Sequence, residues 1–475
     1  MALLENEEIV SEELEDGTMG FVIPDADELI ELIKAKNYQA LRKLTADVPP
    51  KDLAEILNGF PERLSNLFFR LLPKDVAAEV FAMLDSDKCE ELIALFTDKE
   101  LSVLLSELYI DDTVDIIEEM PAAVVKRILK NSSAEDRESI NQLLRYNEDT
   151  AGTIMTTEYV RLQPTMTVAE ALAHIREVAI DKETIYTSFV TDEKKKLLGI
   201  VTAKRLLIAS PEERISEVME DKVIFATTEE DKEAVARKFD KYGFISLPVV
   251  DREMRLVGIV TVDDAIDVLK EEVEEDISIM AAIIPGDTPY VRQSAFNLFK
   301  DRIPWLLFLM ISATFSSAIL GFFEGSLIPV LTVFVPMLMG TGGNSGSQAS
   351  VTTIRALGLG EMSVRDVPRV FFKEVRVGLL CGIFLGVVSF GKIMLIDRLL
   401  LANDSVTVSV AIAVSITLAL TVLIAKLVGC TLPVLAKVVG VDPAVMASPL
   451  ITTLIDVIAL LVYFFVSANL FGLVV

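Results

Sequence analysis

The sequence predicts a multi-domain membrane protein with an acidic α-helical array, a duplicated α/β segment, one long connecting helix and five membrane-spanning helices. Two observations support this fold class. The chain of 475 residues is 52% hydrophobic, which is too apolar for a large soluble enzyme, yet its 24% of charged residues is too high for membrane spans alone. Residues 296–475 hold 9 acidic and 11 basic side chains, which leaves 62 acidic and 33 basic residues upstream, a net charge of −29. We therefore expect the front part in water and the back part in a bilayer.

The charge and the cysteines exclude several classes of protein. A front part this acidic repels nucleic acid phosphates and anionic lipid surfaces, so its natural partners are cations and not nucleic acid. Two of the three cysteines lie in apolar runs, so neither a disulfide framework nor a cysteine-rich metal site is expected. Because no nucleotide-hydrolysis motif or activated nucleophile is apparent, we predict that the chain is neither a primary pump nor an enzyme. Residues 1–20 are expected to be an acidic tail without the features of a signal peptide.

Residues 21–150 contain short helical units that recur about every 24 residues, such as PPKDLAEILNGFP from residue 49 and LPKDVAAEVFAML from residue 72. This recurrence predicts a small helical solenoid, a fold that usually binds something along one face. Asp111 and Asp115 stand one helical turn apart in a run of acids. On spacing alone they are typical of a solvated acidic helix face.

A second repeat occupies residues 151–262. Its first unit ends in LGIVT at residues 198–202 and its second in VGIVT at residues 257–261, an offset of 59 residues. The repeat resembles a tandem pair of CBS domains, at residues 151–214 and 215–262. Many such pairs bind adenine nucleotides through a Thr-x-x-Asp contact, present here as Thr261 and Asp264, whereas Arg205 replaces the acid in the first unit. The resemblance implies at most one regulatory nucleotide site, for example for ATP, without hydrolysis.

Residues 263–286 are predicted to form the connecting helix. Apolar residues from Val262 to Ile284 follow steps of three and four, which makes one stripe of the helix apolar. Eight of the fourteen residues 263–276 are acids, and only Lys270 is basic. Because like charges on adjacent turns destabilise a helix, it needs counterions to pack on another acidic surface, and divalent cations can supply them. Pro285 and Gly286 end it just before the membrane, where it could press on the cytosolic mouth of a pore.

Residues 287–475 contain five apolar runs long enough to cross the bilayer core, which needs about 20 helical residues. The predicted spans are residues 303–323, 326–355, 374–398, 405–429 and 445–471. Basic residues cluster between the second and third spans, and Trp305 stands beside Lys300 and Arg302 as an interfacial anchor would. The positive-inside rule then predicts a multi-pass protein of the cell membrane with its N-terminus in the cytosol and its C-terminus outside.

The second span contains a glycine-rich segment, PMLMGTGGNSGSQ at residues 336–348. If the backbone unwinds there, carbonyls such as that of Gly343 and the side chains of Asn344 and Gln348 become available to a hydrated cation. The alternative is that the glycines let neighbouring helices pack closely. We favour a lining for a pathway, because close packing alone does not require adjacent Asn and Gln.

Asp456 in the last span is the other unusual feature. Helical spacing puts Thr452, Thr453 and Asp456 on one face, and a carboxylate at that depth is costly unless it is hydrated or paired. A twofold dimer would place two such carboxylates around one axis and match a divalent ion. Oxygen ligands without His or Cys favour hard ions such as magnesium or calcium.

Taken together, the helical solenoid, the CBS pair, the acidic helix and five spans with GTGGNSGSQ and PLITTLID resemble the MgtE family of magnesium channels over nearly the whole chain. The resemblance implies a homodimer with a central cation pore, in which Asp456 is the pore aspartate and Asn344 lies close to it. It also implies that intracellular Mg²⁺ bridges acids of the soluble domains. The matching residues are Asp111, Asp115, Asp264, Asp267, Glu272, Glu275 and Asp276.

The sequence therefore predicts a magnesium-selective channel that carries Mg²⁺ into the cytosol down its electrochemical gradient and closes when intracellular Mg²⁺ binds. Two alternatives stay open. The pore could carry another divalent cation, such as Mn²⁺, Co²⁺ or Ca²⁺. The chain could instead be a membrane-anchored CBS sensor of metal or nucleotide, whose spans serve only as an anchor.

Overall fold

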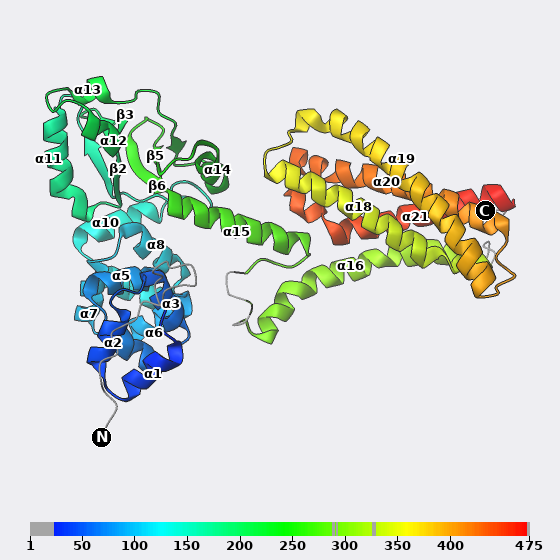
Figure 1. Cartoon of the computed structure of the whole chain (residues 1–475), viewed down its shortest axis with the longest axis horizontal. Helices are drawn as coiled ribbons and strands as arrows, with labels where there is room; N and C mark the ends of the chain where they lie inside the picture. The colour runs from blue at the N-terminus through cyan, green and yellow to red at the C-terminus, as the bar shows by residue number, and fades with distance from the viewer. Residues whose placement is uncertain (1–22, 287–289, 291–292, 325–328, 473–475) are drawn as a thin grey trace, which may run out of the picture. The chain divides into compact units, whose positions relative to one another are not determined.

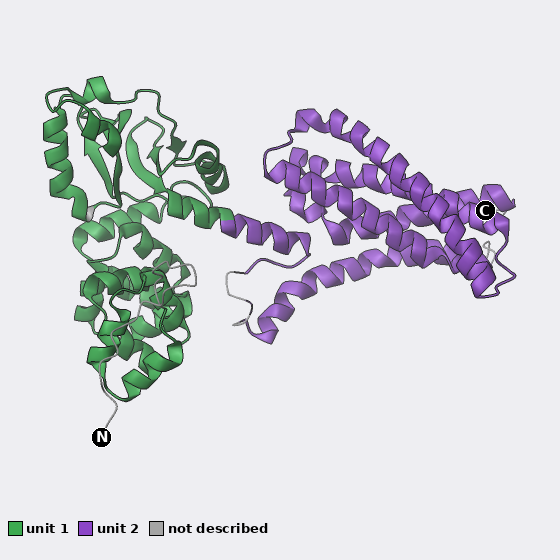
Figure 2. Cartoon of the chain, in the orientation of Figure 1, with its two compact units in different colours: residues 1–269 green, residues 270–475 purple. Residues whose placement is uncertain are grey.

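The computed structural model describes residues 23–286, 290, 293–324 and 329–472 (Figure 1). Residues 1–269 and 270–475 form two compact units (Figure 2). The expected acidic tail over residues 1–20 lies outside the described residues, as do residues 326–328 of the predicted second span.

Unit 1 begins with short helices that pack around a common core, in which Leu29, Leu53 and Leu101 are fully buried. Several of these helices are short because proline separates them. Proline is the N-cap residue of α3, α4, α5 and α9, where it ends the preceding segment and is compatible with the first turn of the following helix. The helices are α1 (Ala26–Lys34), α2 (Tyr38–Thr45), α3 (Pro50–Asn58), α4 (Glu62–Phe69), α5 (Lys74–Ala82), α6 (Ser86–Leu95), α7 (Asp98–Leu105), α8 (Ile110–Glu119), α9 (Ala122–Asn131) and α10 (Ala134–Leu143).

The duplicated segment folds into two three-stranded sheets, in each of which the first two strands are parallel and the last two antiparallel. Phe189, Leu256 and Ile259 form a buried cluster between the two halves. The strands are β1 (Tyr159–Leu162), β2 (Thr184–Thr191), β3 (Leu197–Thr202), β4 (Ala226–Thr227), β5 (Ser246–Val250) and β6 (Leu256–Thr261). The helices are α11 (Val168–Val178), η1 (Ala179–Asp181), α12 (Ala203–Ile208), α13 (Ile215–Val218) and α14 (Lys232–Tyr242).

The connecting helix α15 (Val262–Met280) runs from unit 1 into unit 2, whose remaining elements are helical. These are α16 (Ala295–Glu324), α17 (Pro329–Thr332), α18 (Val335–Gly358), η2 (Val364–Asp366), α19 (Val367–Lys392), the π-helix η3 (Ile393–Leu400), α20 (Val408–Val439), η4 (Pro443–Met446) and α21 (Ser448–Phe471). Four described segments are long and apolar enough to cross a membrane: Ala295–Phe323, Val364–Leu400, Val408–Val439 and Ser448–Phe471. The 24 residues of α18 would span about 36 Å, enough for the bilayer core, but α18 is less apolar.

The second predicted span differs from the expectation in two ways. Its described part is broken between α17 and α18, at Val333 and Phe334. The glycine segment, which we expected to unwind, stays α-helical throughout, so its backbone carbonyls remain part of a helix. The physical reason lies in packing, because Cβ atoms added at Gly342 and Gly346 would lie 2.7 Å and 2.9 Å from side chains of α20 and α21. The close-packing alternative is therefore confirmed for these two glycines.

Among the described glycines of unit 2, Gly429 of α20 leaves the least room for a Cβ, because Gly346 of α18 lies against it. A Cβ at Gly429 would lie 2.3 Å from the carbonyl oxygen of Gly346, and backbone cannot yield as a flexible side chain can. We expect Gly429→Ala to destabilise the protein by about 1–3 kcal/mol, the usual effect of overpacking. Its thermal unfolding midpoint in detergent should fall. The control is Gly391→Ala in α19, where nothing lies within 4 Å, and an equal shift in both variants would contradict the prediction.

Two contacts, one of them buried, anchor the segment that leads into α18. The hydroxyl of Tyr463 in α21, a fully buried residue, donates a hydrogen bond of 2.8 Å to the carbonyl oxygen of Leu331. The Lys392 ammonium lies 5.9 Å from the centre of the Phe334 ring and pairs with Asp397 at 2.8 Å. The start of α18 is thus fixed to α21, the helix that carries Asp456, and to the end of α19.

Candidate metal sites

A seam of hydroxyl groups joins α18 to the start of α21. The Ser448 hydroxyl donates to the Ser347 oxygen at 2.9 Å, and the Ser347 and Thr452 oxygens are 3.5 Å apart. Gly343 makes this approach possible, because a Cβ there would lie 2.8 Å from the Thr452 methyl carbon. Ser347 and Ser448 were not singled out from the sequence. Their signal was weak, since serine is common both in membrane helices and at helix starts.

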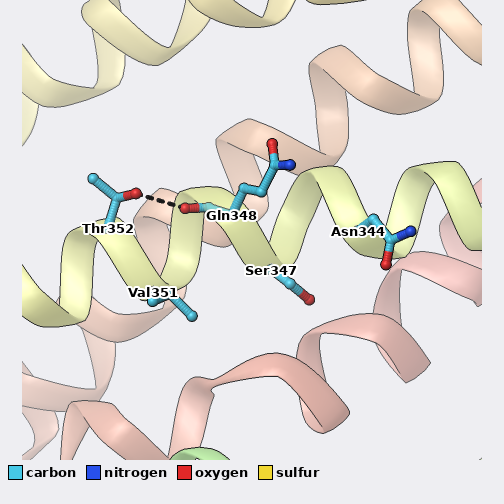
Figure 3. Close-up of a pocket in the computed structure, with 5 residues that line it drawn as sticks. All are labelled: Asn344, Ser347, Gln348, Val351 and Thr352. Atoms are coloured by element: carbon cyan, nitrogen blue, oxygen red, sulfur yellow. Dashed lines mark hydrogen bonds between the residues drawn. The ribbon is translucent and has the colours of Figure 1, made fainter.

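Asn344, Ser347 and Gln348 line an open cavity of about 580 Å³ along α18, together with Val351 and Thr352 (Figure 3). The Thr352 hydroxyl donates to the Gln348 carbonyl oxygen at 2.7 Å, so it is satisfied within its own helix. The Asn344 and Gln348 side chains are exposed in the single chain. Amide groups cannot be left facing lipid without cost, so this face of α18 requires water or protein against it.

Asp456 stands one turn beyond Thr452 on α21 and is half-buried. Its Oδ1 atom is buried and makes no hydrogen bond within the described residues. By contrast, the hydroxyls of Thr452 and Thr453 donate to the carbonyls of Ser448 and Pro449 at 2.7 Å and 2.9 Å. Among the described residues of unit 2, Asp456 is therefore the carboxylate with a buried oxygen that has no hydrogen-bond partner.

A second group of carboxylates lies within unit 1. One carboxylate oxygen from each of Asp111, Glu158 and Glu183 lies within 4.8 Å of the other two, an arrangement that could hold a metal ion. One buried oxygen of each residue, Oδ1 of Asp111 and Oε2 of each Glu, makes no hydrogen bond within the described part of the chain. Three carboxylates with orphaned oxygens and no nitrogen or sulfur ligand suit a hard divalent cation.

The fold explains how these three acids meet. Asp111 is in the first turn of α8, while Glu158 and Glu183 immediately precede β1 and β2. Because β1 and β2 are parallel, their starts lie at the same edge of the sheet, and the backbone N–H of Glu183 donates to the Glu158 carbonyl at 2.9 Å. Sequence reasoning predicted Asp111 but missed both glutamates. An acid directly before each of the first two strands was the available signal, and it needed the strand pairing to become meaningful.

Burial and mutual repulsion raise the pKa values of this group. Burial followed by the charge of Asp111 raises the pKa of Asp112 and Glu158 to about 7 and that of Glu183 to about 8. Burial likewise raises the pKa of Asp111. Asp115 is exposed at the rim, and its pKa is raised in the same direction. The folded structure therefore disfavours negative charge on these acids at neutral pH when no cation is bound.

Asp264, at the start of α15, belongs to the same electrostatic group. Burial raises its pKa to about 6, a hydrogen bond from the Thr261 hydroxyl opposes the shift, and the charge of Asp111 adds to it. Of the predicted regulatory acids, the structure thus couples Asp111, Asp115 and Asp264. Asp267 is the next acid along α15 in unit 1, while Glu272, Glu275 and Asp276 follow in unit 2. Their joint ligation of an ion stays a prediction.

The apolar stripe of α15 is divided between two environments. Ile279 and Met280 pack against Ile354, Ala444 and Ala447 within unit 2. Other members of the predicted stripe are exposed, among them Ile266 at 46%, Val273 at 56% and Ile277 at 57%. The carboxylate of Asp276 lies 4.0 Å from the position a Cβ would take at Gly358, so this part of α15 also approaches the end of α18.

The profile of the MgtE divalent cation transporter family matches residues 335–466, that of the MgtE intracellular N domain matches residues 48–149, and the CBS domain matches residues 151–212 and 215–271. The magnesium transporter MgtE of Thermus thermophilus is 38% identical over 444 residues, which cover 92% of this chain and 97% of that protein. The chain belongs to the MgtE family. The magnesium transporter MgtE of Bacillus subtilis is 30% identical over 92% of this chain and 95% of its own length.

Two solved structures resemble the soluble part of this MgtE protein. One is the cytosolic domain of the Mg²⁺ channel MgtE in complex with ATP, with 38% sequence identity and a TM-score of 0.49, covering 51% of this chain and all of the other. The second is the soluble part of a magnesium transporter, with 28% identity and a TM-score of 0.49, covering 52% of this chain and 97% of that one.

The raised pKa values predict how metal-free stability depends on pH. In the folded protein Asp112, Glu158 and Glu183 hold protons up to about pH 7–8, whereas in the unfolded chain they lose them near pH 4. The folded state therefore binds more protons between these limits, and the free energy of unfolding must fall as pH rises through them. Thermal unfolding of the full chain in EDTA should show a lower midpoint at pH 8 than at pH 6.

The matched variant for this measurement is Glu158→Gln combined with Glu183→Gln. Removing two of the titrating groups should flatten the dependence on pH. If the wild-type midpoint in EDTA rises with pH, or if the variant has the same slope as wild type, the electrostatic account of the cluster is wrong.

Proposed function

We propose that this MgtE protein is a magnesium channel that takes Mg²⁺ into the cytosol down its electrochemical gradient and that intracellular Mg²⁺ closes. The observation that carries the proposal is Asp456, which has an unpaired buried carboxylate oxygen at membrane depth beside a hydroxyl seam. The relatives named as magnesium transporters, similar over nearly their full length, support magnesium as the ion. Other divalent cations remain the competing substrates.

The exposed polar face of α18 supports the proposal of a homodimer. In a single chain, the side chains of Asn344 and Gln348 are exposed, although they belong to a helix in the membrane part. A second copy related by a twofold axis would enclose this face and bring two Asp456 side chains around one pathway. The pair would supply two negative charges, and the amides and hydroxyls would supply neutral oxygens for a hydrated Mg²⁺, which loses water reluctantly. Asn344, Gly343, Gln348, Thr452, Thr453 and Asp456 are the proposed pore residues.

The proposed orientation has a cytosolic N-terminus and an external C-terminus. Ions then enter the cell with the inside-negative potential, which contributes about 2.3 kcal/mol per charge per 100 mV. Three arginines support this orientation through the positive-inside rule: Arg355 in the last turn of α18, Arg365 in η2 and Arg369 in the first turn of α19. Reporter tags at each end of the chain would test it.

We further propose that the acids of unit 1 and α15 form the internal magnesium sensor. Burial first, and the charges of neighbouring acids second, raise the pKa values of Asp112 and Glu183, so negative charge is unfavourable there without a divalent cation. A divalent ion held there supplies positive charge that neutralises and bridges carboxylates. Binding to the compact state favours that state by mass action, and α15, whose end packs on unit 2, is placed to transmit the change to the pathway.

The second half of the CBS pair is proposed to hold an adenine nucleotide such as ATP, without hydrolysing it. Thr261 and Asp264 carry this proposal, because their hydrogen bond fixes the carboxylate at the first turn of α15. The same carboxylate lies within the acidic group around Asp111, so nucleotide and magnesium would affect each other's binding.

The deciding experiment is Mg²⁺ flux into liposomes that hold the purified full chain, with internal Mg²⁺ near zero and then at several millimolar. A channel gives flux at low internal Mg²⁺ and little at high internal Mg²⁺. A membrane-anchored sensor gives no flux under either condition, although its acidic domains still bind magnesium. Replacing external Mg²⁺ by Mn²⁺, Co²⁺ or Ca²⁺ in the same assay would identify the ion carried.

A further inference from the structure

The helical array of unit 1 contains a groove of about 400 Å³ that neither the pore nor the acidic cluster uses. Phe69 and Phe96 form its apolar floor with Leu104, and these side chains are each 6% exposed. They belong to α4, to the end of α6 and to α7, so the groove lies between helices that are distant in sequence. None of the residues that line the groove belongs to α8, the helix that carries Asp111.

Cations surround this floor, which is unusual in such an acidic part of the chain. Arg70, Lys74 and Lys99 line the groove and are all exposed. Arg70 pairs with Glu100 at 3.1 Å, but Lys74 and Lys99 make no ion pair with any described residue. Around them, residues 23–148 carry 26 acids against 15 basic residues. Two acids also line the groove, Glu107 and the Glu100 that pairs with Arg70, so its lining has three basic and two acidic side chains. The groove therefore offers two ammonium groups above an apolar floor, in contrast to its acidic surroundings, and it fits an acidic segment with apolar side chains.

The chain itself contains such a segment outside the described residues. Residues 1–16, MALLENEEIVSEELED, contain seven acids and no basic residue, and Leu3, Leu4, Ile9 and Val10 interrupt the acids as apolar pairs. Twenty-two residues precede Ile23, where the described chain begins, and fully extended they reach about 70 Å. A domain of this size has a radius of gyration of about 14 Å, so the tail can reach any face of it.

We propose that the acidic N-terminal tail of the same chain docks in this groove. Its apolar pairs cover Phe69 and Phe96, and its carboxylates pair with Lys74 and Lys99. Tethering makes the docking effective, because a segment on a short linker is present at millimolar local concentration. The contact is largely between exposed charges, so it weakens as salt screens them. The inference does not depend on the proposed channel function.

Zero-length carbodiimide cross-linking of the full-length protein in detergent tests the proposal, because it joins only amines and carboxylates that are in contact. Peptide mass spectrometry should find amide bonds from Lys74 and Lys99 to glutamates of residues 5–13. The internal control is Lys126 in α9, which is also exposed and unpaired within the described residues but lies outside the groove. Its links to the tail should be about tenfold fewer, equivalent to about 1.4 kcal/mol of preference.

A charge swap separates docking from general attraction. Lys74→Glu combined with Lys99→Glu should remove the tail links to the groove, whereas Lys126→Glu should leave the groove links unchanged. Adding Glu5→Lys, Glu7→Lys and Glu8→Lys to the groove variant should restore cross-links, now from tail lysines to groove glutamates. Equal links to Lys126, failure of the swap to restore linking, or links mainly between copies in a mixture of isotopically labelled and unlabelled protein would overturn the proposal.

Discussion

Replacing Asp456 by alanine should abolish magnesium flux through the reconstituted protein. Its buried Oδ1 has no partner within the described residues, so it is the anionic ligand that the membrane part offers to a cation. A hydrogen bond to a charged group contributes about 1.5–3 kcal/mol, and a twofold pore loses one such ligand from each copy. The combined loss of about 3 kcal/mol corresponds to at least about a 100-fold fall in flux at low internal Mg²⁺.

The control for this measurement is Asn469→Ala on the same helix, at an exposed residue outside the proposed pore set. The Asn469 amide already donates to the Phe465 carbonyl at 2.7 Å, so its removal should cost much less flux. Asp456→Asn keeps the shape of the side chain and removes only the charge, and it should behave as the alanine variant does. Wild-type flux from Asp456→Asn would show that the charge has no part in conduction and would remove the basis for the proposed pore.

Neutralising the acids of the connecting helix should leave the channel open at high internal magnesium. The variant carries Asp264→Asn, Asp267→Asn, Glu272→Gln, Glu275→Gln and Asp276→Asn, which removes five negative charges from α15. Without these carboxylates, internal Mg²⁺ has little differential affinity for the closed state and cannot shift the equilibrium toward it. We expect flux with several millimolar internal Mg²⁺ to match the flux with internal Mg²⁺ near zero.

A second variant with the same loss of charge tests whether position matters. Neutralising five exposed acids of the helical array, namely Glu31, Glu55, Glu62, Asp75 and Glu90, changes the net charge equally but leaves α15 intact. This control should still close at high internal Mg²⁺. Normal closure in the α15 variant would contradict the gating proposal, and loss of closure in both variants would show that net charge alone sets the gate.

Local patterns in the sequence predicted many of the elements closely. The ends of the two repeat units, at residues 198–202 and 257–261, lie in β3 and β6, and the predicted connecting helix is found as α15. Such predictions succeed because helical and strand periodicity are properties of neighbouring residues. Long apolar helices lie at the predicted spans, but their ends differ: α20 continues to Val439, past the expected end at residue 429, whereas α21 begins at Ser448, after the expected start at residue 445. Hydropathy locates the apolar core of a span, while the exact ends of the helix depend on what it packs against.

The sequence by itself determined the order of the parts, their charge, the presence of apolar spans and the polar candidates Asn344 and Asp456, because each of these is written in composition or local spacing. Only the tertiary structure decided that the glycines of α18 serve helix packing, because the atoms that fill the space around them belong to α20 and α21. Only the tertiary structure brought Asp111, Glu158 and Glu183 together, because two parallel strands begin beside the first turn of α8. Contacts between residues so far apart depend on how elements pack, which no local pattern in one chain records.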